Sequence, residues 1–477
     1  MGGNNQTFIG VFPGISFEFT QGPDHTIRGA GVIAALIINN GTIRAEPGTN
    51  GAILRINRPQ TNNGLIGAGA GATLRFDSNV SDTTQSASGV IFAADGGRVE
   101  LGVQTITGGT LQTTGSGVIA VDGNTPTLID LTIAAGSAVN VSGGRNLRLA
   151  GSTITNNGTI TLNSNSVSSL SQLQLNSNLA LEGTGEIVLN GMGTQAVWIG
   201  FPDLGRVLTN GADHTIRGNG LLEGKIINNG RIEGDSDTEK MDIYGRLSGS
   251  DALKNVDIGF SFQFGRGTYA PGESTAVVSL EGSFTLSSSA STLEIEIGGL
   301  TAGTEFDQLT SAGTVNLGGT LDVIALDRGS YVPIAGDRFE VINSTNAISG
   351  TFFDTSFPDI LDARSVAWLP VDYTTDPNKV FLEIATVDFL SADFDEDFDV
   401  DGDDLAQWEG DYGLNGNSDA DGDGDSDGAD FLTWQRQFGL GVPSLASSQT
   451  VPEPSAIVLL FSTFCCLGWE GRLAPCD

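Results

Sequence analysis

The sequence predicts a mainly β protein whose largest part is a parallel β-solenoid (β-helix). Only 7% of the 477 residues are aromatic, glycine occurs 67 times, and short Val, Ile, Leu and Thr runs alternate with Asn-Gly, Gly-Gly and Ser-Gly pairs. Few large side chains and many glycine corners favour stacked β-turns over a globular core. No helical periodicity is sustained over several turns in the first 265 residues.

We expect several segments, because a chain of this length exceeds what one core usually organises. They are a repetitive β-solenoid over 1–265, a β-rich segment that closes the solenoid over 266–390, paired acidic loops with short helices over 391–440, a polar linker over 441–450, and a tail with an apolar helix over 451–477.

A long-range repeat supports the solenoid. Residues 24–29 and 213–218 both read Asp-His-Thr-Ile-Arg-Gly, and residues 37–41 and 226–230 both read Ile-Ile-Asn-Asn-Gly, with a common offset of 189. A third Asn-Asn-Gly-Thr-Ile occupies 156–160. In a solenoid each strand stacks on the next coil while Asn and Gly form the corners. Stacking therefore explains the pattern.

Charge excludes one class of partner. The 57 acidic and 22 basic residues give a net charge of -35, which repels nucleic acid and favours cations. Residues 393–430 alone hold 14 Asp and 2 Glu without any Lys or Arg. All three cysteines lie in the last thirteen residues, so we expect no disulfide in the β region or the acidic loops.

The first residues differ from a secretory signal. No Lys or Arg precedes Arg28, and Gly, Asn and Pro interrupt every apolar run. The chain also begins inside a repeat, because Ile-Gly-Val-Phe-Pro at 9–13 corresponds to Ile-Gly-Phe-Pro at 199–202. We expect upstream residues to be missing.

Strands become longer between residues 266 and 388 and alternate apolar with polar side chains, as in Leu293, Ile295 and Ile297. One face of these strands should be buried and the other exposed to solvent. The stretch resembles the β segment after the solenoid repeats of bacterial autotransporter-like and PEP-CTERM surface proteins. The residues that carry the resemblance are 270–274, 293–299, 305–309, 336–339 and 350–352.

Aspartates in residues 419–430 have the spacing of a calcium-binding loop. Oxygen ligands fall at loop positions 1, 3, 5 and 12, Gly424 falls at position 6, and the carbonyl of position 7 adds to the shell. The same layout occurs 26 residues earlier, at 393–404, with Phe398 at position 6. We expect up to two Ca²⁺ ions. The expected ligands are Asp393, Asp395, Asp397, Asp399, Asp404, Asp419, Asp421, Asp423, Asp425 and Asp430.

Each loop is followed by apolar residues at i, i+3 and i+7, which predicts a short helix with one apolar face. These residues are Leu405, Trp408 and Tyr412 after the first loop, and Phe431, Trp434 and Phe438 after the second. The two faces can pack together. The alternative is an acidic disordered linker, which the repeated spacing and repeated aromatics disfavour.

The duplicated loop and helix, with Asp as the last ligand, resembles the type I dockerin module over residues 393–439. The resemblance implies two Ca²⁺ ions and docking onto a cohesin-like domain. Here Gly-Asp at 402–403 and Gly-Ala at 428–429 stand where dockerins usually carry partner-recognition residues.

The tail contains Pro452, Glu453 and Pro454, followed by an apolar run over 456–469 and by Arg472. This resembles the PEP-CTERM sorting signal. The resemblance implies export, transient membrane contact, removal of the tail by an exosortase-type enzyme, and a place on the cell surface or in the extracellular matrix. The run is shorter than the ~20 residues needed to span a bilayer. A buried helix is the alternative.

Catalytic residues are not expected from the sequence. The two histidines, His25 and His214, occupy the same place in the repeat, which favours a structural corner over a unique catalytic site. The motifs Asn-Thr-Asp, Gly-His-Gly and Arg-Ile-Lys of polygalacturonase-like hydrolases do not occur.

The main hypothesis is therefore an exported, calcium-binding, non-enzymatic surface or matrix protein with an adhesive or structural role, whose partner is surface polysaccharide or another surface protein. One alternative is a secreted polysaccharide-acting enzyme, a β-helix lyase or glycoside hydrolase with a dockerin, which would need two carboxylates in a cleft. A cohesin-binding scaffold subunit is a third hypothesis.

Overall fold

The structure is a computed structural model of the chain. It describes residues 8–10, 18–48, 51–77, 82–123, 125–166, 169–192, 196–200, 205–236, 238–249, 252–261, 265–272, 274–326, 331–358, 366–386, 390–397 and 399–440. The sorting motif and the expected apolar helix of the tail lie outside these residues. Within them, no helix combines the length and the apolar character needed to cross a bilayer.

The chain forms two compact units. One comprises residues 1–360 and 368–384, and the other comprises 361–367 and 385–477. The first unit is built from strands, whereas the second contains the two helices.

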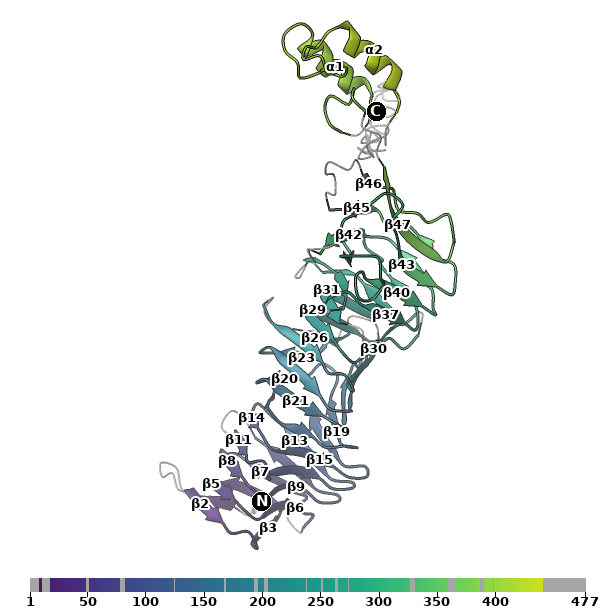
Figure 1. The fold of residues 1–477 in the computed structure, drawn as a ribbon. Helices are drawn as coiled ribbons and strands as arrows, with labels where there is room; N and C mark the ends of the chain where they lie inside the picture. Colours follow the sequence, from purple (N-terminus) through teal and green to yellow (C-terminus); the bar gives the residue numbers. More distant parts are fainter. Residues whose placement is uncertain are drawn as a thin grey trace, which may run out of the picture. The chain divides into compact units, whose positions relative to one another are not determined.

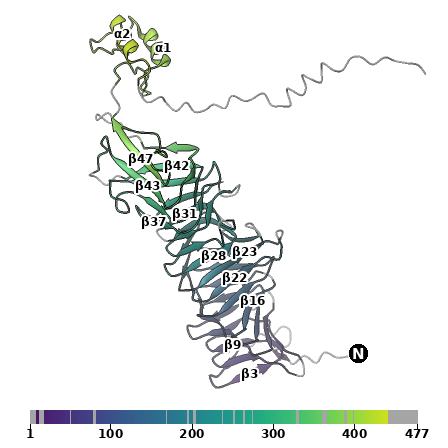
Figure 2. The same ribbon diagram turned by 90° about the vertical axis from the view of Figure 1, so that its right-hand side faces the viewer.

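Each coil of the first unit contributes strands to three ladders, in which equivalent strands of successive coils pair in parallel. In one coil these strands are β4, β5 and β6, and they pair with β7, β8 and β9 of the next coil, respectively. Figures 1 and 2 show the coils stacked along one axis from β2 and β3 toward β42 and β43. The predicted parallel β-solenoid is confirmed.

The first ladder contains β1 (Phe8–Gly10), β4 (Gly31–Ala34), β7 (Ile53–Ile56), β10 (Thr73–Phe76), β13 (Arg98–Leu101), β16 (Val118–Val121), β19 (Ala138–Val141), β22 (Thr159–Asn163), β25 (Glu186–Asn190), β28 (Thr215–Asn219), β30 (Arg231–Glu233), β32 (Leu253–Lys254), β37 (Val277–Leu280), β40 (Gln308–Ser311) and β43 (Arg338–Ser344). The second contains β2 (Glu18–Gln21), β5 (Leu36–Asn39), β8 (Gln60–Asn62), β11 (Thr83–Gln85), β14 (Thr105–Thr107), β17 (Thr127–Ile129), β20 (Asn146–Ala150), β23 (Ser171–Leu175), β26 (Val197–Gly200), β33 (Val256–Ile258), β38 (Phe284–Thr285), β41 (Val315–Leu317) and β44 (Ser349–Gly350).

The third ladder contains β3 (Thr26–Gly29), β6 (Thr42–Ala45), β9 (Leu65–Ala68), β12 (Val90–Ala93), β15 (Thr110–Thr113), β18 (Thr132–Ile133), β21 (Thr153–Asn156), β24 (Leu179–Glu182), β27 (Val207–Asn210), β36 (Thr268–Pro271), β39 (Thr292–Ile297), β42 (Thr320–Ala325) and β45 (Asp354–Ser356). Two long strands, β29 (Leu221–Asn228) and β31 (Met241–Gly249), belong to both the second and third ladders. Outside the ladders, β34 (Phe260–Ser261) pairs with β35 (Gly265–Arg266). The remaining strands are β46 (Val366–Trp368) and β47 (Lys379–Thr386).

Aliphatic side chains stack inside the coils. Successive strands place one buried residue above another at the same register position, because side chains of a strand alternate between its two faces. Full burial of each such side chain contributes roughly 1.5–3 kcal/mol. In the first ladder the stack is Leu74, Val99, Ile119, Val139, Ile160, Ile187, Ile216, Ile232 and Leu253.

Asparagine side chains fill corners between the aliphatic stacks. Asn39 Nδ2 donates to Asn62 Oδ1 at 2.8 Å, and Asn62 Nδ2 donates to Gln85 Oε1 at 2.9 Å. The buried amides are thus satisfied by the next coil. The glycine after Asn-Asn permits the close approach, because a Cβ at Gly41 would lie 2.2 Å from the carbonyl oxygen of His25. Contact between coils therefore explains the Asn-Asn-Gly repeat.

The two long copies of the repeat lie at different corners of the coil. Asn39 ends β5, between the second and third ladders, whereas Asn228 ends β29, between the third and first ladders. Asn228 Oδ1 accepts a hydrogen bond of 2.8 Å from Asn210, the equivalent residue of the preceding coil. The repeat therefore encodes a corner that can be used at more than one place in a coil.

The two histidines share a backbone turn but differ in burial. Each donates its backbone N–H to the glycine carbonyl three residues earlier, at 3.1 and 3.0 Å. The side chain of His25 is exposed, whereas His214 is fully buried. Its Nδ1–H donates to Asn210 Oδ1 at 2.7 Å, and its Nε2 accepts from Asn156 Nδ2 at 3.0 Å. Burial lowers the pKa of His214 to about 4, so the imidazole is neutral at pH 7.

Parallel pairing continues across residue 265, the expected boundary, since β31 pairs with β36 and β36 with β39. Large aromatic side chains enter the core here, with Tyr269 beside Phe284 and Phe306 beside Phe339. The last rung of the first ladder, β43, pairs antiparallel with β47. The other edge of β47 is also bonded, because its residues exchange backbone hydrogen bonds with residues 369–372 at 2.9 to 3.1 Å.

Mild acid should destabilise the solenoid through His214. The unfolded chain binds a proton near pH 6.5 but the folded chain only near pH 4, so stability present above pH 6.5 is lost as the pH falls toward 4. We expect a loss of about 2 kcal/mol between pH 7 and pH 5. Urea unfolding followed by circular dichroism measures it. His214→Gln should remove this part of the pH dependence, and the exposed His25→Gln should keep the wild-type profile. Identical profiles for all three proteins would contradict the assignment.

Candidate metal centre

The two helices of the second unit each begin directly after an acidic loop. The N-cap of α1 (Gly402–Asp411) is Asp401, and that of α2 (Gly428–Gln437) is Asp427. Each cap carboxylate accepts from backbone N–H groups of the first turn, and the Asp at the third helical position accepts from the N–H of the cap. This reciprocal arrangement satisfies amides that a helix start leaves unpaired. The same hydrogen-bonded residues therefore end each acidic loop and begin the helix that follows it.

Each helix also holds the loop that precedes the other helix. The indole N–H of Trp434 donates to the carbonyl of Asp401 at 2.8 Å, and that of Trp408 donates to the carbonyl of Asp427 at 2.9 Å. The rings of Trp408 and Phe431 lie 4.9 Å apart between centroids. The predicted packing of the two apolar faces is confirmed around Trp408, Phe431 and Trp434. Tyr412 and Phe438, expected on the same faces, lie just past the helix ends and are 54% and 56% exposed. The buried core of this unit is Ala392, Phe394, Val400 and Trp434.

Backbone N–H groups surround the carboxylate of Asp419, at position 1 of the second loop. Its Oδ1 accepts from Gly422 and Asp423 at 2.7 and 3.1 Å, and its Oδ2 accepts from Gly424 at 2.8 Å. Asp430, at position 12, is fully buried and accepts from three backbone N–H groups of the loop at 2.7 to 3.2 Å. The loop is therefore wrapped around its first and last carboxylates.

The first loop repeats this geometry with one difference. Asp404 is fully buried and accepts from three backbone N–H groups at 2.6 to 3.3 Å, and Asp393 accepts from Asp397 at 3.1 Å. At position 4, Gly422 of the second loop has φ +83° and Glu396 of the first has φ +60°. A side chain at this φ strains the backbone. Backbone strain at Glu396 therefore destabilises the first loop, and Gly422 avoids this strain in the second loop.

Within the part of the chain that the structure describes, carboxylates gather in four groups of three. Within each group one oxygen of every residue lies within 4.8 Å of the others. Carboxylate oxygens are hard ligands that suit divalent cations, so both loops have the donors to hold a metal ion. The groups are Asp393, Asp395 and Asp404; Asp399, Asp401 and Asp404; Asp419, Asp421 and Asp430; and Asp425, Asp427 and Asp430.

Burial and mutual repulsion disfavour the charged form of several of these carboxylates. Burial, followed by the charge of Asp397, raises the pKa of Asp395 to about 6. Partial desolvation by the loop raises the pKa of Asp421, although its side chain is exposed, and the charge of Asp423 is the main cause that raises the pKa of Asp425. A divalent cation would stabilise the ionised carboxylates. The electrostatics therefore favour binding of a cation.

The groups differ in part from the expected ligand set. Asp397 and Asp423, at position 5, are in none of the groups found among the described residues, whereas the position-9 residues Asp401 and Asp427 are included. The sequence carried this signal, because Asp occupies every odd position of both loops through position 9. Phe398, at position 6 of the first loop, lies outside the described residues.

Comparison with protein families and with curated proteins finds no match for this chain. Function is therefore inferred from the geometry of the loops and from the surface of the solenoid.

A groove of about 350 Å³ on the first ladder carries the carboxylates of Asp77, Glu100 and Asp122. Each of them forms an ion pair with an arginine of a neighbouring coil. These pairs connect successive coils, and proton transfer by the carboxylates would require the arginines to move away. The arrangement is that of a structural ion-pair ladder.

Replacing Gly422 by Ala should weaken the second loop through the backbone alone. No atom lies within 4 Å of the added Cβ, but φ is +83°, so we expect a cost of about 1 kcal/mol. Gly428→Ala is the matched control, because it also meets no atom within 4 Å and lies in the first turn of α2. Hydrogen exchange of the α2 amides should accelerate roughly fivefold only in the first variant. Equal exchange in both variants would refute the strain argument.

Proposed function

We propose that this protein is an exported, calcium-binding, non-enzymatic component of the cell surface or extracellular matrix, with an adhesive or structural role. The observation that carries the proposal is the pair of loops with the same hydrogen-bonded geometry, each with a buried Asp at position 12 and further carboxylates beside it.

Ca²⁺ fits this donor set better than Mg²⁺. Ca²⁺ accepts six to eight oxygen ligands in an adaptable arrangement, whereas Mg²⁺ demands an octahedral site and usually keeps several waters. Each loop offers several carboxylates on a short stretch of backbone. In the second loop the ion would be held by Asp430 together with Asp419 and Asp421, or together with Asp425 and Asp427.

Calcium would act on the stability of the second unit. An ion that binds the folded loops and not the unfolded chain adds its binding free energy to folding. Because Trp408 and Trp434 each bond the loop of the other helix, order in one loop supports order in the other. We propose that this unit is a calcium-dependent docking or stiffening element, with a cohesin-like domain as one candidate partner.

The sequence of the tail supports the proposed location. Pro452, Glu453 and Pro454 precede an apolar run, as in the PEP-CTERM sorting signal. An exosortase-type enzyme would then be the processing partner, and membrane contact would be transient. The solenoid would serve as a spacer and as an adhesive face toward surface polysaccharide.

Calorimetric titration of Ca²⁺ into the full-length protein tests the proposal. We expect saturable binding of up to two ions. Asp430→Asn should weaken the second site and Asp404→Asn the first, each roughly tenfold or more, because each removes a buried charge from the ligand set. Asp403→Asn is the control, since Asp403 is exposed and belongs to none of the groups described above.

Two results would overturn the proposal. One is a wild-type protein that releases or absorbs no saturable heat with Ca²⁺. The other is an Asp403→Asn protein that loses as much affinity as the Asp404→Asn protein, which would indicate non-specific attraction by the acidic segment.

A further inference from the structure

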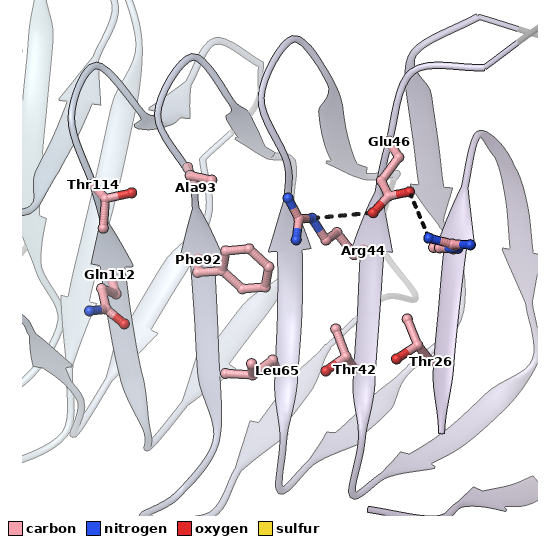
Figure 3. Close-up of a pocket in the computed structure, with 11 residues that line it drawn as sticks. Thr26, Thr42, Arg44, Glu46, Leu65, Phe92, Ala93, Gln112 and Thr114 are labelled. Atoms are coloured by element: carbon pink, nitrogen blue, oxygen red, sulfur yellow. Dashed lines mark ion pairs between the residues drawn. The ribbon is translucent and has the colours of Figure 1, made fainter. Parts of the chain in front are cut away.

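A second groove, of about 510 Å³, lies on the outer face of the third ladder near the start of the solenoid. It crosses β3, β6, β9, β12 and β15, and Figure 3 shows the side chains that line it. It is lined by cationic, aromatic, hydroxyl and amide side chains, with a single carboxylate, Glu46. We call it the N-terminal groove.

The groove follows one row of register-matched residues. Parallel pairing places Arg28 beside Arg44, Arg44 beside Gly67, Gly67 beside Phe92, and Phe92 beside Gln112. Neighbouring strands lie about 4.8 Å apart, so the row extends for roughly 19 Å along the stack. Its length and open shape suit an extended chain better than a compact small molecule.

Gly67 shapes the middle of the row. A Cβ at this position would lie 2.0 Å from the carbonyl oxygen of Phe92 and 2.5 Å from its Cδ1. The Phe92 ring therefore lies over the backbone of Gly67 and remains partly exposed (Figure 3). Leu65 beside it is 41% exposed. Together they form an apolar platform on an otherwise polar face.

The positive charges of the two arginines in the row are only partly neutralised by acidic side chains of the protein. Arg28 and Arg44 share the carboxylate of Glu46, at 3.9 and 3.5 Å, and their side chains are 71% and 42% exposed. Arg44 Nε is buried without a hydrogen-bond partner among the described residues, so a ligand would meet only the exposed part of the guanidinium group. In contrast, Arg217 of a later coil makes two hydrogen bonds to Glu186, at 2.6 and 3.1 Å. The groove thus keeps one positive charge in excess.

We propose that the N-terminal groove binds an acidic polysaccharide, a glycan chain that carries carboxylate groups. Arginine pairs with carboxylates by charge-assisted, often bidentate hydrogen bonds. The apolar face of a sugar ring can pack on Phe92, and sugar hydroxyls can bond Thr42 and Gln112. This proposal rests on the adhesive function proposed above and specifies its ligand.

A peptide fits the groove less well than a glycan. The strands β6, β9 and β12 pair with neighbours on both sides, so they offer no free edge to which an extended peptide could add. Recognition must use side chains alone. The net charge of the whole chain opposes a polyanion only at long range, because salt screens charges beyond about 8 Å at physiological ionic strength.

Calorimetry with full-length protein in a calcium chelator tests the proposal. The probes are an oligogalacturonate of eight sugars, a neutral glucose oligosaccharide of equal length, and polyglutamate. We expect binding of the oligogalacturonate, roughly tenfold weaker binding in Arg28→Gln/Arg44→Gln, and weakening by added salt. Phe92→Leu should weaken binding while keeping the platform apolar. Arg148→Gln, on the second ladder, is the control and should bind normally.

Each contrary outcome has one meaning. Unchanged binding in the double arginine variant would refute the site. Equal affinity for polyglutamate would show a general polyanion surface and refute glycan recognition. Circular dichroism and unfolding midpoints check that each variant is folded, and the double arginine variant still tests the site if Phe92→Leu is unstable. Because the chelator removes Ca²⁺, failure here is independent of the calcium titration.

Discussion

Parallel pairing between coils is the constraint on which the first unit depends. Strands of the three ladders give their backbone hydrogen bonds to the neighbouring coils, so each residue must suit the residue at the same register position one coil away. Inside, this produces the aliphatic stack from Leu74 to Leu253. At corners it produces the amide ladder of Asn39, Asn62 and Gln85. Outside, it aligns side chains such as Arg44 and Phe92 into rows.

The second unit is held together without stacked coils. Two loops and two helices are too few to bury a large core, so they bond across to one another through Trp408 and Trp434. The helix starts at Asp401 and Asp427 are also the ends of the loops. Charge repulsion within the loops opposes this compact arrangement, and a bound cation would relieve it. The solenoid contains no comparable concentration of charge.

The sequence predicted the general architecture well because its signals are local. Alternation and glycine corners predicted the solenoid, and ligand spacing with apolar residues at i, i+3 and i+7 predicted the loops and helices. Other features depend on the surroundings. The sequence could not show that Asn39 and Asn228 lie at different corners, or that His214 is buried while His25 is exposed, because neighbouring coils decide both. Backbone strain at Glu396 was also not predicted. Gly422 at the equivalent position of the second loop indicated that a positive φ is needed there.

The antiparallel strand β47 has a consequence for assembly. A parallel stack of coils is open-ended, and an unpaired last rung could receive a rung from another molecule. Here β47 lies on the last rung in the opposite direction, and residues 369–372 occupy its outer edge. At this end β47 closes the first ladder, so another molecule cannot extend that ladder by adding a rung to β43. A strand that runs in the opposite direction thus disfavours, on this ladder, the rung-by-rung growth into fibres to which an uncapped stack is prone.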